Sequence, residues 1–287
     1  MLKSNLKIAF LISGMARNYI YCSPTFKKHI LDNCNGDIFI SFKRNSRTHY
    51  SNSDIINQIS LRQRTPISDR IDDIVFLKNL FGNKLKYFNY DDEQYISSLK
   101  NEKLKSIHEN LQNEEHVINM IDQYARVKNI AEKFEDYCNK TQTPTKYDIV
   151  VRLRLDKIWW TQNINITDFI KNAESPKLYL SYINWTKSAN NNLPNWIQDY
   201  FFMGNKDDMI YIMKDFFTNM YNSYEFTLEH ELNKSPEIQL GNYINSNSNL
   251  QQKIVNSEIR YKLCPYYFNF PLYLQGYYIR NYNNKIQ

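Results

Sequence analysis

The sequence predicts an α/β fold in which a mixed, mostly parallel sheet is flanked by helices. Two observations favour this fold. The first forty residues read as a buried strand, a helix and a second buried strand, which is the unit that builds parallel sheets. A long amphipathic helix over residues 114–138 then leads into another buried strand over residues 147–155. The alternation of strands and helices therefore continues into the second half of the chain.

The N-terminal elements follow one another closely. Residues 7–13 form a continuous apolar run and are expected to be a buried strand. Gly14 then permits a tight turn into a loop that contains Arg17. Residues 24–31 begin with a proline, as the first turn of a helix often does, and residues 37–42 form the second apolar strand.

The next segment is less regular. Residues 43–64 are polar without a sustained period, so a mobile loop is expected there. A helix is expected over residues 66–81, with Pro66 in its first turn and Gly82 as its stop signal. Residues 84–90 are the third expected strand.

Hydrophobic periodicity defines the second half of the chain. Ser235 and Pro236 have the chemistry of a helix N-cap and first turn. Polar residues 184–195 are expected to be a loop over a site, and a strand-rich tail with many tyrosines begins near Glu258. The expected elements are strands over residues 147–155, 178–183 and 199–203 and helices over residues 114–138, 206–221 and 236–244.

Length and composition favour one globular domain with insertions over residues 1–287. Hydrophobic residues make up 42% of the chain, with 23 Tyr and 16 Phe, which is enough to bury a sizeable core. No apolar run approaches the roughly 18–20 residues that span a bilayer. A soluble, cytoplasmic protein is therefore expected, with peripheral attachment to a membrane left open.

The net charge of +6 favours an anionic partner, which is nucleic acid, membrane headgroups or the diphosphate of a cofactor. Basic residues form no consecutive block and acidic residues are interspersed among them, so nucleic acid is not the expected partner. The four cysteines form no CxxC pair and show no zinc-type spacing. Reduced, structural thiols are expected.

The most informative segment is the strand that reads YDIVVRLRLD over residues 147–156. Because side chains alternate between the faces of a strand, its charges share one face near the carboxyl end, where open α/β sheets bind ligands. Either the charges form a structural ion-pair ladder, or two arginines hold an anion such as a nucleotide diphosphate while the carboxylate binds Mg²⁺ or Mn²⁺. The residues of this face are Val150, Arg152, Arg154 and Asp156.

The helix before this strand carries Lys128 within its apolar stripe. The ammonium either extends to solvent or meets an anion, and the neighbouring charged strand suggests the same phosphate. Gln123 lies at the edge of the stripe and is a weaker candidate. Arg126 is expected to point away from the stripe and to lie on the surface.

Three further features are candidates for the same site. The turn over residues 13–17 offers backbone amides and a guanidinium, although it is neither a GxGxxG motif nor a P-loop. Asp199 opens an otherwise apolar strand, as a turn or cap, or as a ligand of a sugar hydroxyl or a general base. Glu237 either interacts with a helix N-terminus or acts in catalysis.

Taken in order, these motifs resemble a loose group of GT-A-type glycosyltransferases from bacteria and large DNA viruses. The resemblance runs from the N-terminus to about Ile244, and it is the order of the motifs that carries it. The matching segments are IAFLISGMAR, DIFIS, residues 123–128, YDIVVRLRLD, QDYFFMGN and SPEIQLGNYI.

The resemblance implies a GT-A-like fold with a nucleotide-binding half over residues 1–156 and an acceptor-side half and tail over residues 157–287. It also implies transfer of a sugar from a UDP-, GDP- or dTDP-linked donor to a glycan or glycoprotein acceptor. Asp156 stands where the metal-binding carboxylate of a D-x-D motif would be, but Arg154 occupies the first acidic position. Asp199 would face the donor sugar or the acceptor, and Glu237 would be the base. By similarity, the donor's nucleotide and diphosphate would be held by Gly14, Arg17, Lys128 and Arg152.

Two other functions remain open from the sequence. The arginine in the D-x-D position and the aromatic C-terminus also suit a non-catalytic protein that binds glycans or nucleic acid on a degenerate transferase fold. Another nucleotide-using enzyme, such as a nucleotidyltransferase, would share the same diphosphate chemistry.

Overall fold

The computed structural model describes residues 6–15, 19–43, 48–49, 65–66, 73–106, 114–140, 146–155, 177–182, 197–222 and 236–253. The main strands are β1 (Ile8–Met15), β2 (Gly36–Lys43), β5 (Leu85–Tyr90), β6 (Ile149–Leu153), β7 (Tyr179–Tyr182) and β8 (Ile197–Asn205). The helices are α1 (Tyr19–His29), α3 (Asp73–Phe81), α4 (Glu93–Ser106), α5 (Glu114–Lys140), α7 (Lys206–Asn222), α8 (Pro236–Ser246) and α9 (Ser248–Gln251). Short pieces complete the described chain: the 3-10 turns Leu31–Asn33 and Gly82–Lys84 and the two-residue strands β3 (Thr48–His49) and β4 (Thr65–Pro66).

One six-stranded sheet organises these elements, in the order β5-β2-β1-β6-β8-β7. β1 pairs in parallel with β2 and with β6, and β2 pairs in parallel with β5. β8 is antiparallel to both β6 and β7. The predicted α/β fold with a mixed, mostly parallel sheet is therefore confirmed.

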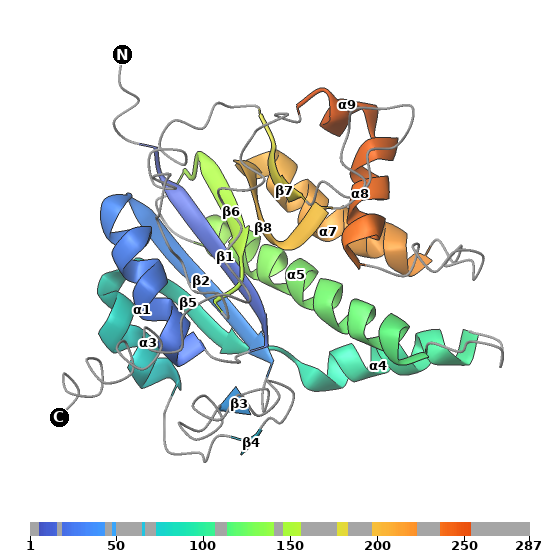
Figure 1. Ribbon diagram of the computed structural model, residues 1–287, viewed down its shortest axis with the longest axis horizontal. Coiled ribbons are helices and arrows are strands. Elements are labelled where there is room, and N and C mark those ends of the chain that lie inside the picture. The colour runs from blue at the N-terminus through green and yellow to red at the C-terminus, as the bar shows by residue number, and fades with distance from the viewer. Residues whose placement is uncertain are drawn as a thin grey trace, which may run out of the picture.

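Helices cover both faces of the sheet. Figure 1 shows α1 and α3 on one side and α5 and α7 on the other, with α8 beside α7. β1 sits near the centre of the sheet and is buried throughout residues 8–13. Such two-sided burial explains why β1 and β2 read as continuous apolar runs instead of alternating ones.

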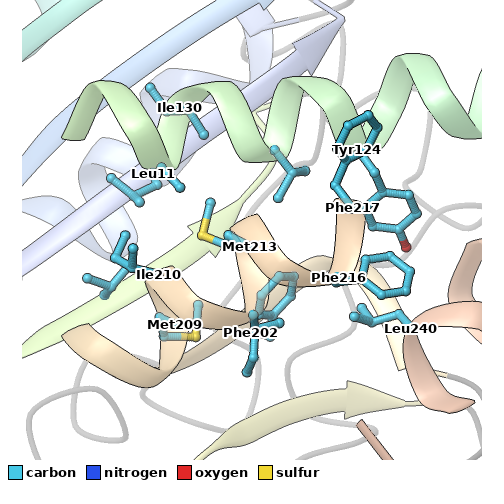
Figure 2. Packing of buried hydrophobic residues seen from close by; sticks show 14 of the residues in the cluster. Leu11, Tyr124, Ile130, Phe202, Met209, Ile210, Met213, Phe216, Phe217 and Leu240 are labelled. Carbon is cyan, nitrogen blue, oxygen red and sulfur yellow. The ribbon is translucent and has the colours of Figure 1, made fainter. Parts of the chain in front are cut away.

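The larger hydrophobic cluster fills the space between the sheet, α5 and α7. Figure 2 shows the apolar side chains of α7 gathered below α5, with Leu11 of β1 at one end and Leu240 of α8 at the other. The ring of Tyr124 on α5 meets Phe216 on α7 edge to face at 4.5 Å. The apolar stripes predicted for these two helices are thus the two halves of one core.

The opposite face of the sheet packs on α1 and α3. Its contacts are largely aromatic, and Phe10 of β1 meets Phe26 of α1 edge to face at 5.2 Å. In β6, Val150 belongs to the α5 side, and Ile149, Val151 and Leu153 belong to the α1 side. The alternation predicted for this strand is confirmed.

The first helix begins earlier than its sequence predicts. α1 starts at Tyr19, and Pro24 lies inside it instead of opening it. Tyr19 is fully buried, and its ring lies 5.1 Å from Phe42 and 5.6 Å from Phe76. This burial stabilises a turn before the proline, although Pro24 has no N–H to donate within the helix.

The helix expected over residues 66–81 is shorter than predicted. α3 begins at Asp73, and Pro66 belongs to β4. The carboxylate of Asp73 is buried and accepts hydrogen bonds from the hydroxyls of Tyr19 and Tyr90. These long-range contacts fix the first turn of the helix at Asp73, which local sequence does not reveal.

The remaining predicted strands and helices occur within one or two residues of their expected positions. Most of the loop predicted over residues 43–64, the loop over residues 184–195 and the C-terminal tail lie outside the described residues. Within the described part of the chain, no helix is long and apolar enough to cross a membrane.

Candidate functional site

The order of the strands marks one point on the sheet edge. From β1 the chain moves outward to β2 and β5, and it then returns to the other side of β1 as β6. The carboxyl ends of β1 and β6 therefore lie side by side where the strand order reverses. Open α/β sheets bind ligands in the crevice at such a switch point. We call this edge the carboxyl edge.

Gly14 lies at the end of β1, on the carboxyl edge. Its φ is +122°, a backbone conformation that residues with a side chain rarely adopt. A Cβ atom built on Gly14 would meet nothing within 4 Å among the described residues. The glycine is therefore favoured by backbone conformation and not by crowding, although it lies within β1, paired with Phe42 of β2, and not in the turn that the sequence predicts.

Arg152 lies in β6 on the sheet face covered by α5. In the register it stands between Leu11 of β1 and Phe202 of β8, and it is 1% exposed. Its guanidinium donates to the carbonyl oxygen of Leu153 and, at 3.3 Å, to that of Ser13. The charge is thus directed from the core toward the carboxyl edge, beside Gly14.

Other predicted residues fall around the same edge. Arg154 directly follows β6 and is half-buried. Asp199 lies in β8 two residues before Phe201, which pairs with Leu153, so its backbone is at the carboxyl end of β6. Glu237 is in the first turn of α8. The structure does not describe the side chains of Asp199 and Glu237.

The direction of α8 relates Glu237 to this edge. Beyond α9, the carbonyl oxygen of Lys253 accepts from the backbone N–H of Leu178 at 2.8 Å, near the amino end of β6. The C-terminal end of α8 leads to that opposite edge, so its first turn lies toward the carboxyl edge. Arg17 and Asp156, the other two predicted residues, lie outside the described part of the chain.

Lys128 takes a different position from the arginines of β6. Its ammonium lies over the ring of Phe217 on α7, 5.6 Å from the centroid, and 3.8 Å from the carboxylate of Glu132. Its side chain is 25% exposed. Lys128 therefore occupies the outer seam between α5 and α7, where its stem covers apolar surface.

The sequence predicts Arg126 on the surface, and this prediction is wrong. Arg126 is 1% exposed, and all five of its N–H groups donate to carboxylates. Asp122 and Glu93 each accept two of these bonds, and Asp91 accepts one at 2.6 Å. Asp122 lies one turn earlier on α5, and the other two carboxylates follow β5.

Further side chains join this group, which we call the Arg126 network. Asp91 also accepts from the hydroxyl of Ser41 on β2 and from the amide of Asn129 on α5. Asp122 also contacts the ammonium groups of Lys43 and Lys100. Through these contacts the network joins β2, α4 and α5 at the carboxyl ends of β2 and β5.

The pKa values of Asp122 and Arg126 are determined mainly by their oppositely charged partners. Burial by itself would raise the pKa of Asp122, but hydrogen bonds and charge from Arg126, with Lys100 and Lys43, outweigh burial and hold that pKa well below its usual value. The pKa of Arg126 is likewise lowered by burial and raised more strongly by its carboxylate partners. Both groups are therefore charged at neutral pH.

The predicted metal site depends on residues outside this network. Among the described residues, no three carboxylate, histidine or cysteine side chains are grouped so that they could hold a metal ion. Asp91, Glu93 and Asp122 already accept hydrogen bonds from Arg126, so they are not arranged as metal ligands. Binding of Mg²⁺ or Mn²⁺ thus remains a prediction that rests on Asp156.

Comparisons with known proteins add no relative. A scan of the sequence against protein-family models finds no match, and a search of curated proteins finds no similar sequence. The assignment of function therefore rests on the geometry of the carboxyl edge.

Proposed function

We propose that this chain is a glycosyltransferase that transfers a sugar from a nucleotide-sugar donor and holds the donor's diphosphate at the carboxyl edge between β1 and β6. The position of Arg152 carries the proposal. Its buried guanidinium reaches the carbonyl of Ser13 at the switch point, next to the positive φ of Gly14. A buried positive charge at a ligand-binding edge is typical of an anion site.

The chemistry of the arginines supports a diphosphate in particular. The carbonyl oxygens of Leu153 and Ser13 accept from the guanidinium of Arg152 and orient it at this edge. Arg154 directly follows β6, two residues after Arg152, so a second guanidinium is available near the same edge. Planar guanidinium groups bind phosphate oxygens through paired hydrogen bonds.

The transfer itself needs three further contributions. The bond between the anomeric carbon and the diphosphate oxygen breaks, a hydroxyl oxygen of the acceptor bonds to that carbon, and the hydroxyl proton passes to Glu237. Asp199 would bind a hydroxyl of the donor sugar or the acceptor. A divalent metal held by Asp156 would supply charge that stabilises the departing diphosphate. The backbone position of Asp199 at the carboxyl end of β6 is compatible with its role.

The cysteines bear on the compartment. Cys34 and Cys138 are buried, and the four cysteines of the sequence form no CxxC pair, which suits reduced, structural thiols. We accordingly place the enzyme in a bacterial or host cytoplasm.

Calorimetric titration with UDP, GDP and dTDP, with and without Mn²⁺, tests the proposal. Folded protein should bind at least one of them, and Asp156→Ala should abolish turnover of the matching nucleotide sugar. Asp148→Ala is the matched control, since Asp148 is a carboxylate just before β6, where it accepts from the backbone N–H of Lys7. Near-normal turnover in Asp156→Ala would show that the metal site is misassigned.

The non-catalytic alternative has one observation in its favour, the arginine at position 154 where a D-x-D motif has an acidic residue. A protein that binds glycans or nucleic acid without turnover would show no nucleotide-sugar hydrolysis. Nucleic-acid binding would in addition weaken steeply as salt is raised. The same titrations, repeated with oligonucleotides and glycans, separate the two functions.

A further inference from the structure

Lys43 is the last residue of β2 and lies beside the end of β1. In the parallel register it pairs with Met15, one residue beyond Gly14. Its side chain shares the α5 face of the sheet with Ser41, since the two residues are two apart in the strand. The side chain of Lys43 is 27% exposed, so a ligand can reach it.

The ammonium of Lys43 contacts a carboxylate that other cations already bind. Asp122 accepts two hydrogen bonds from Arg126 and a short one from Lys100. Lys43 lies 3.3 and 3.4 Å from the two oxygens of Asp122, which are the longest of these contacts. Of the three cations, Lys43 therefore holds Asp122 least closely.

Ser13 supplies a second observation at the same edge. Its side chain is 2% exposed, and its hydroxyl oxygen has no hydrogen-bond partner among the described residues. Ser13 pairs with Ser41 in β2, and its carbonyl accepts from Arg152. Buried hydroxyl groups are normally satisfied, so a polar partner that binds at this point would complete the site.

The spacing of the strands lets these groups reach one ligand. β2 and β6 flank β1 on either side, so they are about 10 Å apart, twice the usual spacing of neighbouring strands. Lys43 ends β2 and Arg154 directly follows β6, and Ser13 lies between these two positions on β1. A diphosphate above the end of β1 would lie between the long side chains.

We propose that Lys43 is a further anion-binding residue of the carboxyl edge, which exchanges Asp122 for the donor's diphosphate, and that the hydroxyl of Ser13 donates to the same group. The inference deepens the proposed function and rests on it for the identity of the ligand. The Arg126 network retains Arg126 and Lys100 on Asp122 after the exchange. The exchange therefore does not leave the carboxylate without a cation.

Two lysines that share Asp122 provide a matched test. Lys43→Gln should weaken binding of UDP, or of whichever nucleoside diphosphate binds, by about tenfold to hundredfold, as expected for loss of a charged hydrogen bond. Lys100→Gln removes a cation from the same carboxylate but from α4, and should change the affinity less than about twofold, within the usual effect of a distant substitution. Lys43→Arg keeps the charge and should retain most of the affinity. Thermal melting of each variant shows that the protein tested is folded.

The outcomes separate this inference from the proposed function when inorganic pyrophosphate is titrated alongside the nucleotides. Normal affinity in Lys43→Gln, or an equal loss in Lys43→Gln and Lys100→Gln, overturns the direct role of Lys43 while the glycosyltransferase proposal stands. Binding of pyrophosphate but of no nucleoside diphosphate, with Lys43→Gln weakened, supports the anion site and contradicts the glycosyltransferase. If wild-type protein binds none of these probes, both are wrong.

Discussion

Replacement of Arg126 by methionine tests the role of the Arg126 network. Methionine fills much of the same volume but donates no hydrogen bond, so Asp91, Asp122 and Glu93 would lose all five bonds from this guanidinium. The side chains of Asp91 and Asp122 are 0% and 6% exposed. Removing one partner of a buried ion pair costs about 3–5 kcal/mol, which is a large share of the roughly 5–15 kcal/mol that stabilises most domains.

Urea denaturation followed by circular dichroism measures this loss. Arg126→Lys should be intermediate, since an ammonium keeps the charge but has three donors in place of five. Lys133→Met is the control, because it removes one cation from the same helix at a half-buried position, and it should change the free energy of unfolding by no more than about 0.5 kcal/mol. Equal losses in Arg126→Met and Lys133→Met would refute the reasoning.

The dependence on pH provides an independent test of the same variant. In the wild type the pKa of Asp122 is held below the ordinary value of 3.8, so its pairing stabilises the fold fully above that pH and is lost as the pH falls further. Arg126→Met lacks the main source of this shift. The difference in unfolding free energy between the two proteins should be largest near pH 7 and should narrow below pH 4. A difference that is constant with pH would assign the effect to packing.

Two further substitutions test other parts of the fold. Gly36→Ala would place a Cβ within 3.0 Å of Cδ2 of Phe10, so it should destabilise the protein by about 1–3 kcal/mol in thermal denaturation, and Phe10→Leu in the same chain should restore part of the loss. Burial and the neighbouring carboxylate of Asp37 raise the pKa of Tyr147 above its ordinary value of 10.0, so the contribution of Tyr147 to stability is full below pH 10 and is lost as the pH rises above it. Tyr147→Phe should be less stable by about 1 kcal/mol at pH 7, and it should lose less stability than the wild type between pH 9 and 11; an identical alkaline loss in both proteins would argue against the shift.

The sequence predicts the sheet and the long helices well because their signal is local. Strands such as β1 and β2 are continuous apolar runs, and α5 and α7 carry apolar stripes at helical spacing. Helix starts depend on distant contacts and are predicted less well. The beginning of α1 depends on the packing of Tyr19 against Phe42 and Phe76, which come from other elements.

Dependence on distant contacts also explains why the sequence predicts Arg126 on the surface. A helical projection shows that Arg126 lies outside the apolar stripe, and a position outside the stripe is usually exposed. It does not show that Asp91 and Glu93, which follow β5, lie against that side of the helix. The only local signal is Asp122, four residues earlier on α5, and such a pair is common on exposed helices. For Lys128, the sequence correctly predicts a position within the apolar stripe. It does not predict that the ammonium lies over the ring of Phe217, which comes from another helix.

Arg126 of α5 and Arg152 of β6 are both 1% exposed, but different groups accept their hydrogen bonds. Arg126 donates all of its N–H groups to carboxylates, so its charge is balanced within the fold. Arg152 donates to the carbonyl oxygens of Leu153 and Ser13, which direct its guanidinium toward the carboxyl edge. Burial alone therefore does not separate a structural arginine from one at a binding site. The kind of acceptor is a second criterion, and together with the switch point between β1 and β6 it is the reason why we propose the diphosphate site at Arg152.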